Sequence, residues 1–387
     1  MRLWTFVGIG VTVLAQAPLA YGQGGSTDSV RQVERRVDLD ARLDESSGLA
    51  FDIEGRLFTI NDGEAILYEV DTLTGGIRSE RRLSDGAVVD WEALALRGDT
   101  LYVGDFGNNA SGNRTDLRVL RYYLDGAPDE LPRADTIAFA YADQGDPSPT
   151  PPNATDFDCE AFVVTADSIY LFTKEWVRLG TAVYALPNAP GRHVARRGGR
   201  LDSVGLVTDA HFRPGDSLLV LSGYSPVLQP FAYVSAGAAA GDFFGGGGLR
   251  VQVELPLHQV EGIATSDGRR YFLSNERFER SIISVSQGLS VLSLGGLVDG
   301  LEGGGTSGVG RLSPKQGLRV WPNPTGGRSW VRASDAADRL RAYDDAGREV
   351  GTWRLDGGGA EVDCGAWPAG TYYFVAPGAG AAAVAKR

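Results

Sequence analysis

The feature that most constrains this chain is a hairpin pattern that recurs five times between residues 46 and 298. Each copy has a short apolar run, a polar turn rich in Asp or Gly, and a second apolar run. The copies are SSGLAFDIEGRLFTIN (46–61), WEALALRGDTLYVGD (91–105), CEAFVVTADSIYLFT (159–173), TDAHFRPGDSLLVLS (208–222) and VEGIATSDGRRYFLSN (260–275). The runs have the length of strands, and β-branched and aromatic residues are common in the second run. Each copy is therefore predicted to be a tight antiparallel hairpin.

Further strand candidates follow each hairpin, for example AILYEVD (65–71) and LRVLRYYL (117–124). Each repeat thus holds about four strands in roughly 40 to 60 residues, which is the period of a β-propeller blade. The predicted fold class is all-β, with a five-bladed propeller followed by a small β-sandwich. The long stretch 114–153 leaves room for a sixth blade. The early segment RQVERRVDL (31–39) is expected to supply an outer strand that closes the ring with the last blade.

Polar residues occupy the open end of every hairpin. In an antiparallel hairpin the first residue of one strand lies beside the last residue of the other. Counting from the turns predicts three opposed pairs: Glu92 with Asp105, Glu160 with Thr173, and Asp209 with Ser222. Glu261 is expected near Asn275, and Ser47 near Asn61, with one extra turn residue in each of these two copies. The first strand of each propeller blade lines the central channel, so these residues are expected to converge at one channel mouth.

Four carboxylates at a narrow mouth need a counter-charge. At about 8 Å and an effective dielectric near 20, each like pair costs about 2 kcal/mol. Raised pKa values, an inserted Lys or Arg, or a bound cation relieve this repulsion. Oxygen ligands of this kind suit Ca²⁺, and the candidate calcium ligands are Glu92, Asp105, Glu160 and Glu261. In the alternative interpretation, the acids accept backbone N–H groups or pair with Arg and so hold one blade to the next.

Secondary candidates surround this ring: Asp90, Asn108, Asn109, Asp158 and His258. Gly and Asn in the loop 104–116 permit left-handed turns, and a plain turn would use the same residues. The acids of NATDFDCEAF (153–162) carry oxygens suited to calcium, although their spacing is not that of an EF-hand loop. His258 precedes Glu261 by three residues and is a candidate general base. The sequence has no motif of a known nucleophile, so whether the protein is an enzyme stays open at this stage.

Three basic residues follow the second strands of their hairpins. Arg114, Lys174 and Arg277 are each placed either to hold an anionic group or to form salt bridges at the surface or between blades.

The ends of the chain predict export. Residues 1–22 combine an early Arg, an apolar run and small residues, as in a cleaved secretory signal peptide. No later stretch is long and apolar enough for a transmembrane span. The expected organisation is a propeller over residues 23–299, a Gly-rich linker over 300–316 and a separate β-domain over 317–387. The net charge of −12 argues against nucleic-acid binding, which needs a basic face.

Three segments of the last domain carry a family resemblance. VWPNPTGG, AYDDAGREVG and WPAGTYYFV resemble the type A C-terminal sorting domain of the bacterial type IX secretion system. The resemblance implies passage through the periplasm and across the outer membrane, with the type IX machinery as partner. The mature protein would be secreted or held at the outer-membrane surface.

The propeller motifs DWEALA, GDFGNN and TDFDCEAF resemble a family of secreted type IX cargo propellers to which no activity is assigned. More distantly, the blade pattern is similar to calcium-binding propellers of the phytase-like kind, which is a likeness of fold alone. Three functions follow as hypotheses. They are a ligand- or calcium-binding module, a calcium-dependent hydrolase such as a phosphoesterase or lactonase, and a structural or adhesion platform. The sequence names no ligand.

Overall fold

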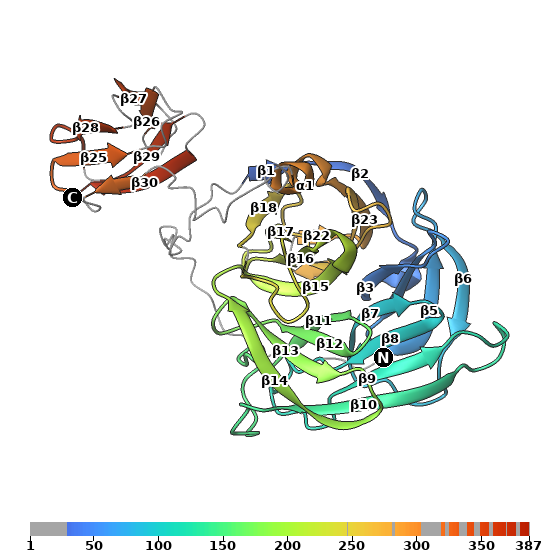
Figure 1. Cartoon of the computed structure of the whole chain (residues 1–387). Coiled ribbons are helices and arrows are strands. Elements are labelled where there is room, and N and C mark those ends of the chain that lie inside the picture. The colour runs from blue at the N-terminus through green and yellow to red at the C-terminus, as the bar shows by residue number, and fades with distance from the viewer. Residues whose placement is uncertain are drawn as a thin grey trace.

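The computed structural model confirms an all-β propeller followed by a β-sandwich. It describes residues 29–245, 247–280, 283–302, 319–321, 325–332, 339–343, 349–355, 359–368, 370–376 and 380–386. The predicted signal peptide and most of the predicted linker lie outside these residues. Five antiparallel four-stranded units stand around a common centre (Figure 1). Their inner strands pack beside one another in a closed ring in the order β3, β7, β11, β15 and β19.

Four blades are formed by strands that follow one another in the chain. The first has β3 (Ser46–Phe51), β4 (Leu57–Asn61), β5 (Glu64–Val70) and β6 (Ile77–Arg82). The second has β7 (Trp91–Arg97), β8 (Thr100–Asp105), β9 (Arg118–Tyr123) and β10 (Arg133–Tyr141). The third has β11 (Cys159–Val164), β12 (Ser168–Thr173), β13 (Thr181–Pro187) and β14 (Gly191–Leu201). The fourth has β15 (Leu206–Arg213), β16 (Leu218–Tyr224), β17 (Pro230–Ala236) and β18 (Leu249–Val253).

The fifth blade closes the ring with a strand from the start of the chain, as the sequence predicted. It consists of β19 (Val260–Ala264), β20 (Arg270–Asn275), β23 (Gly288–Ser293) and β2 (Val33–Asp38). β2 runs antiparallel to β23, from Val33 opposite Leu292 to Asp38 opposite Gly288. A small hairpin of β21 (Phe278–Arg280) and β22 (Ile283–Val285) is inserted between β20 and β23. Closure in this way ties the two ends of the propeller together and leaves the ring without a gap.

The stretch that left room for a sixth blade belongs to the second. It supplies β9, β10 and a long loop, so the described residues form five blades. β10 then pairs in parallel with β14, from Ile137 opposite Gly191 to Tyr141 opposite Ala195, and this joins the second and third blades into one eight-stranded sheet. The short strand β1 (Ser29–Arg31) pairs in parallel with β18.

Large apolar side chains fill the spaces between neighbouring blades. Phe106 of the second blade meets Phe162 of the third edge-to-face, and Phe172 of the third meets Phe243 of the fourth. All four rings are buried, and each contributes roughly 1.5 to 3 kcal/mol of burial free energy. This packing fixes each inner strand beside its neighbours and so positions the side chains at the channel.

The propeller also has one helix and two 3₁₀ turns. The turn η2 (Pro214–Asp216) connects β15 to β16, whereas η1 (Ala41–Leu43) and the helix α1 (Gly295–Glu302) lie outside the blades. α1 packs Val298 against the core shared by the fourth and fifth blades, and its last residues occupy the start of the stretch predicted as linker. Among the described residues, no helix has the length and apolar character needed to cross a membrane.

The C-terminal domain consists of two small antiparallel sheets, as predicted. One contains β24 (Arg319–Trp321), β25 (Arg328–Arg332) and β28 (Gly359–Asp363). The other contains β26 (Arg339–Tyr343), β27 (Glu349–Arg354), β29 (Gly370–Ala376) and β30 (Gly380–Lys386). Val331 and Val362 from the first sheet share a core with Leu340 and Phe374 from the second, which makes a sandwich. Cys159 and Cys364 are both free and buried.

Candidate functional site

A β-bulge interrupts the inner strand of every blade at the same place. The pairing of each inner strand with its second strand skips a residue near the channel mouth. The skipped residues are Gly48 and Leu49 in the first blade, Glu92 in the second, Glu160 in the third, Thr208 in the fourth and Glu261 in the fifth. A bulge leaves its extra residue without a ladder partner and re-aims its side chain. Three of the five equivalent positions are therefore occupied by Glu.

The bulges correct two of the three predicted opposed pairs by one residue. Asp105 lies opposite Trp91 rather than Glu92, and Thr173 lies opposite Cys159 rather than Glu160. Asn275 lies opposite Val260 and Asn61 opposite Ser46, so each is near the Glu261 or Ser47 expected beside it. Counting outward from the turn assumed an uninterrupted ladder, and the bulge inserts one residue between the turn and the mouth. Asp209 does pair with Ser222 as predicted, because its blade places the bulge at Thr208. Asp209 therefore lies one position after the bulge, whereas the three Glu residues of the other blades lie at the bulge itself.

Asp209 acts as a latch between blades. Its carboxylate accepts the backbone N–H of Ile263 in the fifth blade at 2.7 Å and that of Leu49 in the first blade at 3.4 Å. It also accepts the N–H of Ala210 at 2.8 Å. The hydroxyl of Thr208 donates to the Val260 carbonyl at 2.6 Å. Burial raises the pKa of Asp209, and the three N–H donors oppose that shift.

Asp105 is also fully engaged. Arg118 donates to its Oδ2 through Nε at 2.9 Å and Nη2 at 2.7 Å, and Arg114 donates to its Oδ1 at 2.9 Å. Asp105 is completely buried, and a carboxylate held by two guanidinium groups is a compensated charge. The structure therefore places this predicted calcium ligand in an ion-pair cluster within the second blade.

Lys174 supplies the positive charge at the centre of the ring. Its Nζ lies 3.2 Å from Glu160 Oε1 and 3.9 Å from Glu261 Oε1, and the side chain is only 4% exposed. The rings of Trp176 and Tyr224 lie 5.0 and 5.1 Å from the same nitrogen. Burial alone would lower the pKa of Lys174, but the attraction of Glu160 and Glu261 outweighs it and raises the pKa. The insertion of a Lys was one predicted way to relieve the acid ring.

Glu92 and Asp90 lie together, and Lys174 acts on them only from beyond ion-pair distance. A Cβ on Gly107 would lie 2.3 Å from Glu92 Oε1 and 2.4 Å from Asp90 Oδ2, so both carboxylates converge on this glycine. Only Gly at this position leaves space for the pair. Within the described residues, neither carboxylate forms an ion pair. Both residues are partly buried.

The pKa values of this ring are raised. Burial, followed by the charge of Asp158, raises the pKa of Asp90 to about 6. Burial also raises the pKa of Glu160 to about 7, against the pull of Lys174. Burial and the charge of Glu160 hold the pKa of Glu92 well above its usual range. Near neutral pH the site therefore carries protons that a cation would displace.

Asp158, Asn108 and Asn109 connect the second and third blades. Asp158 Oδ1 accepts the N–H of Asn108 at 2.6 Å, and its Oδ2 accepts the indole N–H of Trp176 at 2.8 Å. The amide of Asn108 donates to the Phe157 carbonyl at 3.1 Å, and the carbonyl of Asn109 accepts the N–H of Asn153. These predicted secondary candidates thus position the loop that carries Gly107 against the third blade.

Two further acids, Asp62 and Glu276, directly follow the second strands β4 and β20, and the sequence analysis did not name them. Lys174, which it did name, has the same place after β12. Burial raises the pKa of Asp62 to about 7, and burial with the charge of Glu261 raises that of Glu276 well above its usual range. The signal was available in the sequence, because Asp62 and Glu276 each directly follow the end of a predicted second strand.

The two Asn residues at the strand ends use their amide groups locally. Asn61 donates to the Arg42 carbonyl at 2.6 Å and to Glu64, and Asn275 donates to the carbonyls of Glu276 and Ser286. The Oδ1 atoms of both are buried, and no described residue donates to them.

The remaining candidates stand apart from the ring or are already paired. The Nδ1 of His258 bonds the Pro256 carbonyl at 2.9 Å, and burial lowers the pKa of this imidazole. Arg114 is paired with Asp105 and Asp116, and Arg277 with Glu279 at 2.6 Å. Among the described residues, no group of three His, Cys, Asp or Glu side chains is gathered closely enough to hold a metal ion as it stands.

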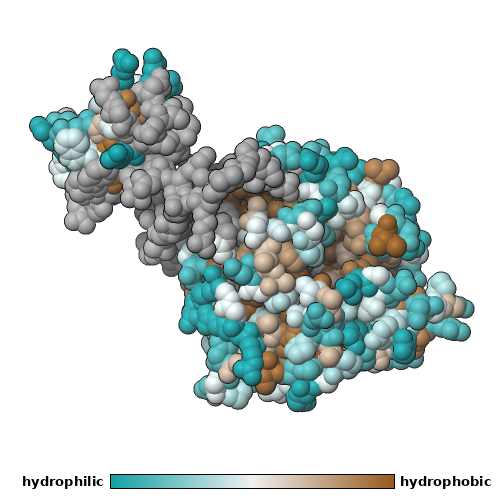
Figure 2. All heavy atoms as spheres, viewed as in Figure 1, coloured by the Kyte–Doolittle hydropathy of each residue, from teal (hydrophilic) through white to brown (hydrophobic). Residues whose placement is uncertain are grey.

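Hydrophilic residues cover most of the propeller face seen in Figure 2, with apolar residues gathered around a hollow near its middle. No protein-family model matches this chain, and no curated protein matches it.

Similar solved structures share little sequence with this chain. A glutaminyl cyclase from Myxococcus xanthus is 14% identical to this chain, with a TM-score of 0.43. The match covers 69% of this chain and 99% of the cyclase chain. The PQQ-bound aldose sugar dehydrogenase from Streptomyces coelicolor is 11% identical, with a TM-score of 0.40, covering 67% and 97%. A gluconolactonase from Xanthomonas campestris is 14% identical, with a TM-score of 0.36, covering 66% and 74%. At these scores the likenesses carry no argument about chemistry.

Proposed function

We propose that the channel mouth binds a divalent cation, Ca²⁺, through Glu92, Glu160 and Glu261, with Asp90 as a further ligand. The observation that carries the proposal is the recurrence of Glu at the bulged position of three inner strands. Carboxylate oxygens are the ligands that Ca²⁺ prefers. Asp105 and Asp209 are left out of this ligand set because guanidinium groups and backbone N–H groups already engage them.

Binding would require a local rearrangement. In the present geometry Lys174 bridges Glu160 and Glu261, and Glu92 lies with Asp90 near Gly107. A divalent ion bound among these carboxylates would take the place of the Lys174 ammonium. It would also displace the protons that the acids hold near neutral pH because their pKa values are raised. Lys174 has a long flexible stem and can withdraw toward Trp176 and Tyr224.

The protein in this proposal is a secreted or cell-surface binding module. The apolar leader in residues 1–22 and the motifs of the last domain support export by the type IX machinery. A hydrolase acting on an anionic substrate would need a basic group free to hold it. The three candidates, Arg114, Lys174 and Arg277, all have carboxylate partners, which favours binding over this alternative. The latch of Asp209 and the Lys174 ion pairs are features that a rigid platform would also use.

Calorimetric titration of the full chain with Ca²⁺, alongside thermal melting in Ca²⁺ and in EDTA, tests the proposal. We expect saturable binding and a higher Tm with calcium. Glu92→Gln combined with Glu160→Gln should weaken binding more than about tenfold, since two ligand charges are lost. The exposed Glu130→Gln serves as the matched control and should bind as the wild type does. Equal calcium responses in the double variant and the wild type would refute the site.

Calcium-loaded protein should also be assayed against phosphoesters and lactones. Turnover that disappears in the double variant would show that the protein is a calcium-dependent hydrolase, as in the second hypothesis, rather than a binding module alone.

A further inference from the structure

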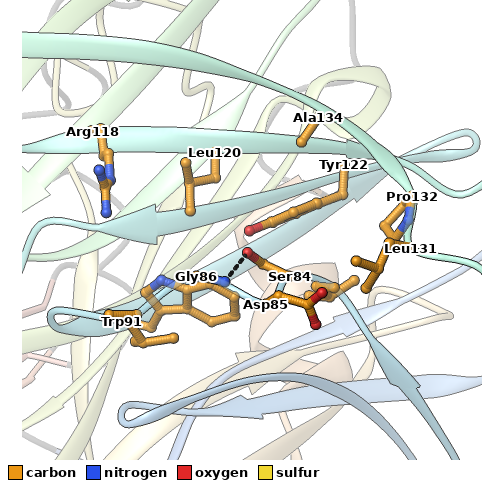
Figure 3. A pocket seen from close by; sticks show the side chains of 13 residues that line it. Ser84, Asp85, Gly86, Trp91, Arg118, Leu120, Tyr122, Leu131, Pro132 and Ala134 are labelled. Carbon is orange, nitrogen blue, oxygen red and sulfur yellow. Dashed lines mark hydrogen bonds between the residues drawn. The ribbon is translucent and has the colours of Figure 1, made fainter.

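The cavity of about 450 Å³ between the first and second blades has a mainly apolar lining (Figure 3). Its charged side chains are paired within the protein, Arg118 with Asp105 and Asp85 with Arg82. Such a lining does not distinguish one apolar ligand from another. The rim of the channel mouth, by contrast, combines exposed apolar side chains with acids, and this combination selects a partner by its charge as well.

Three neighbouring loops at the mouth expose apolar side chains. Val177 lies in the loop after β12, Val227 in the loop after β16, and Leu257 in the connection from β18 to β19. Their exposed fractions are 65%, 76% and 39%, and we call these three residues the apolar rim. Exposed apolar side chains that gather on one face of a protein mark interaction sites, whereas single ones do not.

The three loops leave the blades at residues that contact one another. Lys174 directly follows β12, Tyr224 ends β16, and Glu261 lies in β19. Lys174 Nζ lies 5.1 Å from the Tyr224 ring and 3.9 Å from Glu261 Oε1. The N–H of Leu257 donates to the Leu228 carbonyl at 2.8 Å, which ties two of the loops together. The apolar rim therefore lies beside the acids of the mouth.

The backbone of these loops is strained in the same way. Each loop holds one leucine in the left-handed region, with φ of 54° at Leu179, 57° at Leu228 and 66° at Leu257. A bulky side chain rarely adopts this conformation, and strained backbone that the fold holds in place is common at ligand-binding sites. The N–H of each leucine donates to a loop carbonyl at 2.8 Å, so the rim is a preformed surface.

The charges beside the apolar rim favour a cationic partner. Within the described residues, Glu92, Asp90 and Glu276 form no ion pair. The ammonium of Lys174 shows which kind of group the mouth accepts, because it lies against two carboxylates and two aromatic rings. A second cation that enters from outside would meet the three unpaired acids and would favour their charged forms.

We infer that the channel mouth docks an extended segment of another protein that carries Lys or Arg beside apolar residues. The basic side chain would enter the mouth toward Glu92, Asp90 and Glu276, and the apolar side chains would cover the apolar rim. The inference rests on the proposed function in that it uses the same carboxylates, so calcium and the basic segment would compete for the mouth.

Three labelled peptides with blocked termini test the docking by fluorescence anisotropy on the full chain in EDTA. Leu-Lys-Val-Lys-Leu has both features, Leu-Glu-Val-Glu-Leu has the charge reversed, and Ser-Lys-Ser-Lys-Ser lacks the apolar side chains. We expect the first peptide to bind, with an affinity that falls as the salt concentration rises from about 50 to about 500 mM. The second should not bind, and the third should bind about tenfold more weakly than the first.

The combination of Val227→Ser with Leu257→Asn locates the surface. Both positions are exposed, and Asn tolerates the left-handed backbone at position 257, so the fold should be kept. This double variant should bind the first peptide about tenfold more weakly. Neither residue is a proposed calcium ligand, so calcium binding should be unchanged. Ile53→Ser, at an exposed position in the turn from β3 to β4, is the matched control and should change neither affinity.

Circular dichroism establishes that each variant is folded, and if the double variant fails to fold, Val177→Ser carries the test. The inference is overturned if the first peptide shows no saturable binding, if either comparison peptide binds equally well, or if the rim variant binds like the wild type.

A calcium titration of the same samples separates the two proposals. Calcium should displace the first peptide, because both use Glu92 and Asp90. Peptide binding that survives calcium in a chain saturated with the ion would place the peptide elsewhere and overturn the inference. Peptide binding by a chain that does not bind calcium would uphold the docking and refute the calcium function, whereas calcium binding without peptide binding would do the reverse.

Discussion

The inner strands of the second and fourth blades present acids at the same channel in opposite ways. In the fourth blade, Asp209 is buried and accepts three backbone N–H groups, two of them from other blades. In the second blade, Glu92 and Asp90 crowd together at Gly107, with no ion pair to any described residue. The difference arises from one residue of register, because the bulge falls on Glu92 in one blade and on Thr208, beside Asp209, in the other.

This comparison shows how to separate structural acids from candidate functional ones. A carboxylate whose oxygens are occupied by protein donors stabilises the fold, whereas buried acids that lack such donors hold their place at a cost. The fourth blade therefore secures the ring, and the second blade would supply Glu92 and Asp90 to the proposed cation site. Three changes test that division, in order of decreasing effect.

The largest effect is expected for Asp209→Ala. The N–H groups of Leu49, Ala210 and Ile263 would lose their acceptor in a buried place, which should lower the unfolding free energy by about 3 to 5 kcal/mol. Urea unfolding followed by circular dichroism measures it. Asp209→Asn keeps one acceptor oxygen and should cost less. If Asp209→Ala were as stable as wild type, Asp209 would not be a latch.

Lys174→Met should have the next largest effect. Glu160 and Glu261 would remain buried without their cation, which should cost about 3 kcal/mol near pH 8 in EDTA. Added calcium should restore much of the loss, because the ion takes the place of the ammonium. Near pH 5.5 the loss should be smaller, since Glu160, whose pKa is already about 7, is then protonated.

The matched variant for this experiment is Lys174→Met combined with Glu160→Gln, which removes one of the two uncompensated acids and should recover stability. A loss for Lys174→Met that neither calcium nor Glu160→Gln reduces would contradict the proposed exchange of Lys174 for a cation.

The smallest effect concerns pH. In the folded ring the pKa of Glu160 is about 7, whereas the pKa of a Glu in the unfolded chain is near 4.5. Since the folded state then holds more protons, stability in EDTA should fall as pH rises between these values. Glu92→Gln should flatten this slope and be about 1 kcal/mol more stable than wild type above pH 7. Melting curves across pH measure both, and an unchanged slope in Glu92→Gln would show that Glu92 does not share in the proton uptake.

Much of this architecture was readable from the sequence because local patterns specify it. The spacing of apolar runs and turns in segments such as WEALALRGDTLYVGD defined the hairpins, and their recurrence defined five blades. The closing strand at Val33–Asp38 could be expected because a ring needs its last blade completed. The candidate site was harder to predict from the sequence, because one bulged residue shifts the partner of every residue beyond it by one position. Such shifts occur at Glu92 and Glu160.

By itself, then, the sequence determined the blade repeat, the strands that line the channel and the gathering of acids at one mouth. Only the tertiary structure decided which acids are satisfied. Asp209 reaches N–H groups that lie 160 and 54 residues away in the chain, and Lys174 reaches Glu261 across the channel from another blade. Such partners are chosen when the ring closes, because hydrogen bonds and charge pairs depend on distances that local spacing does not encode.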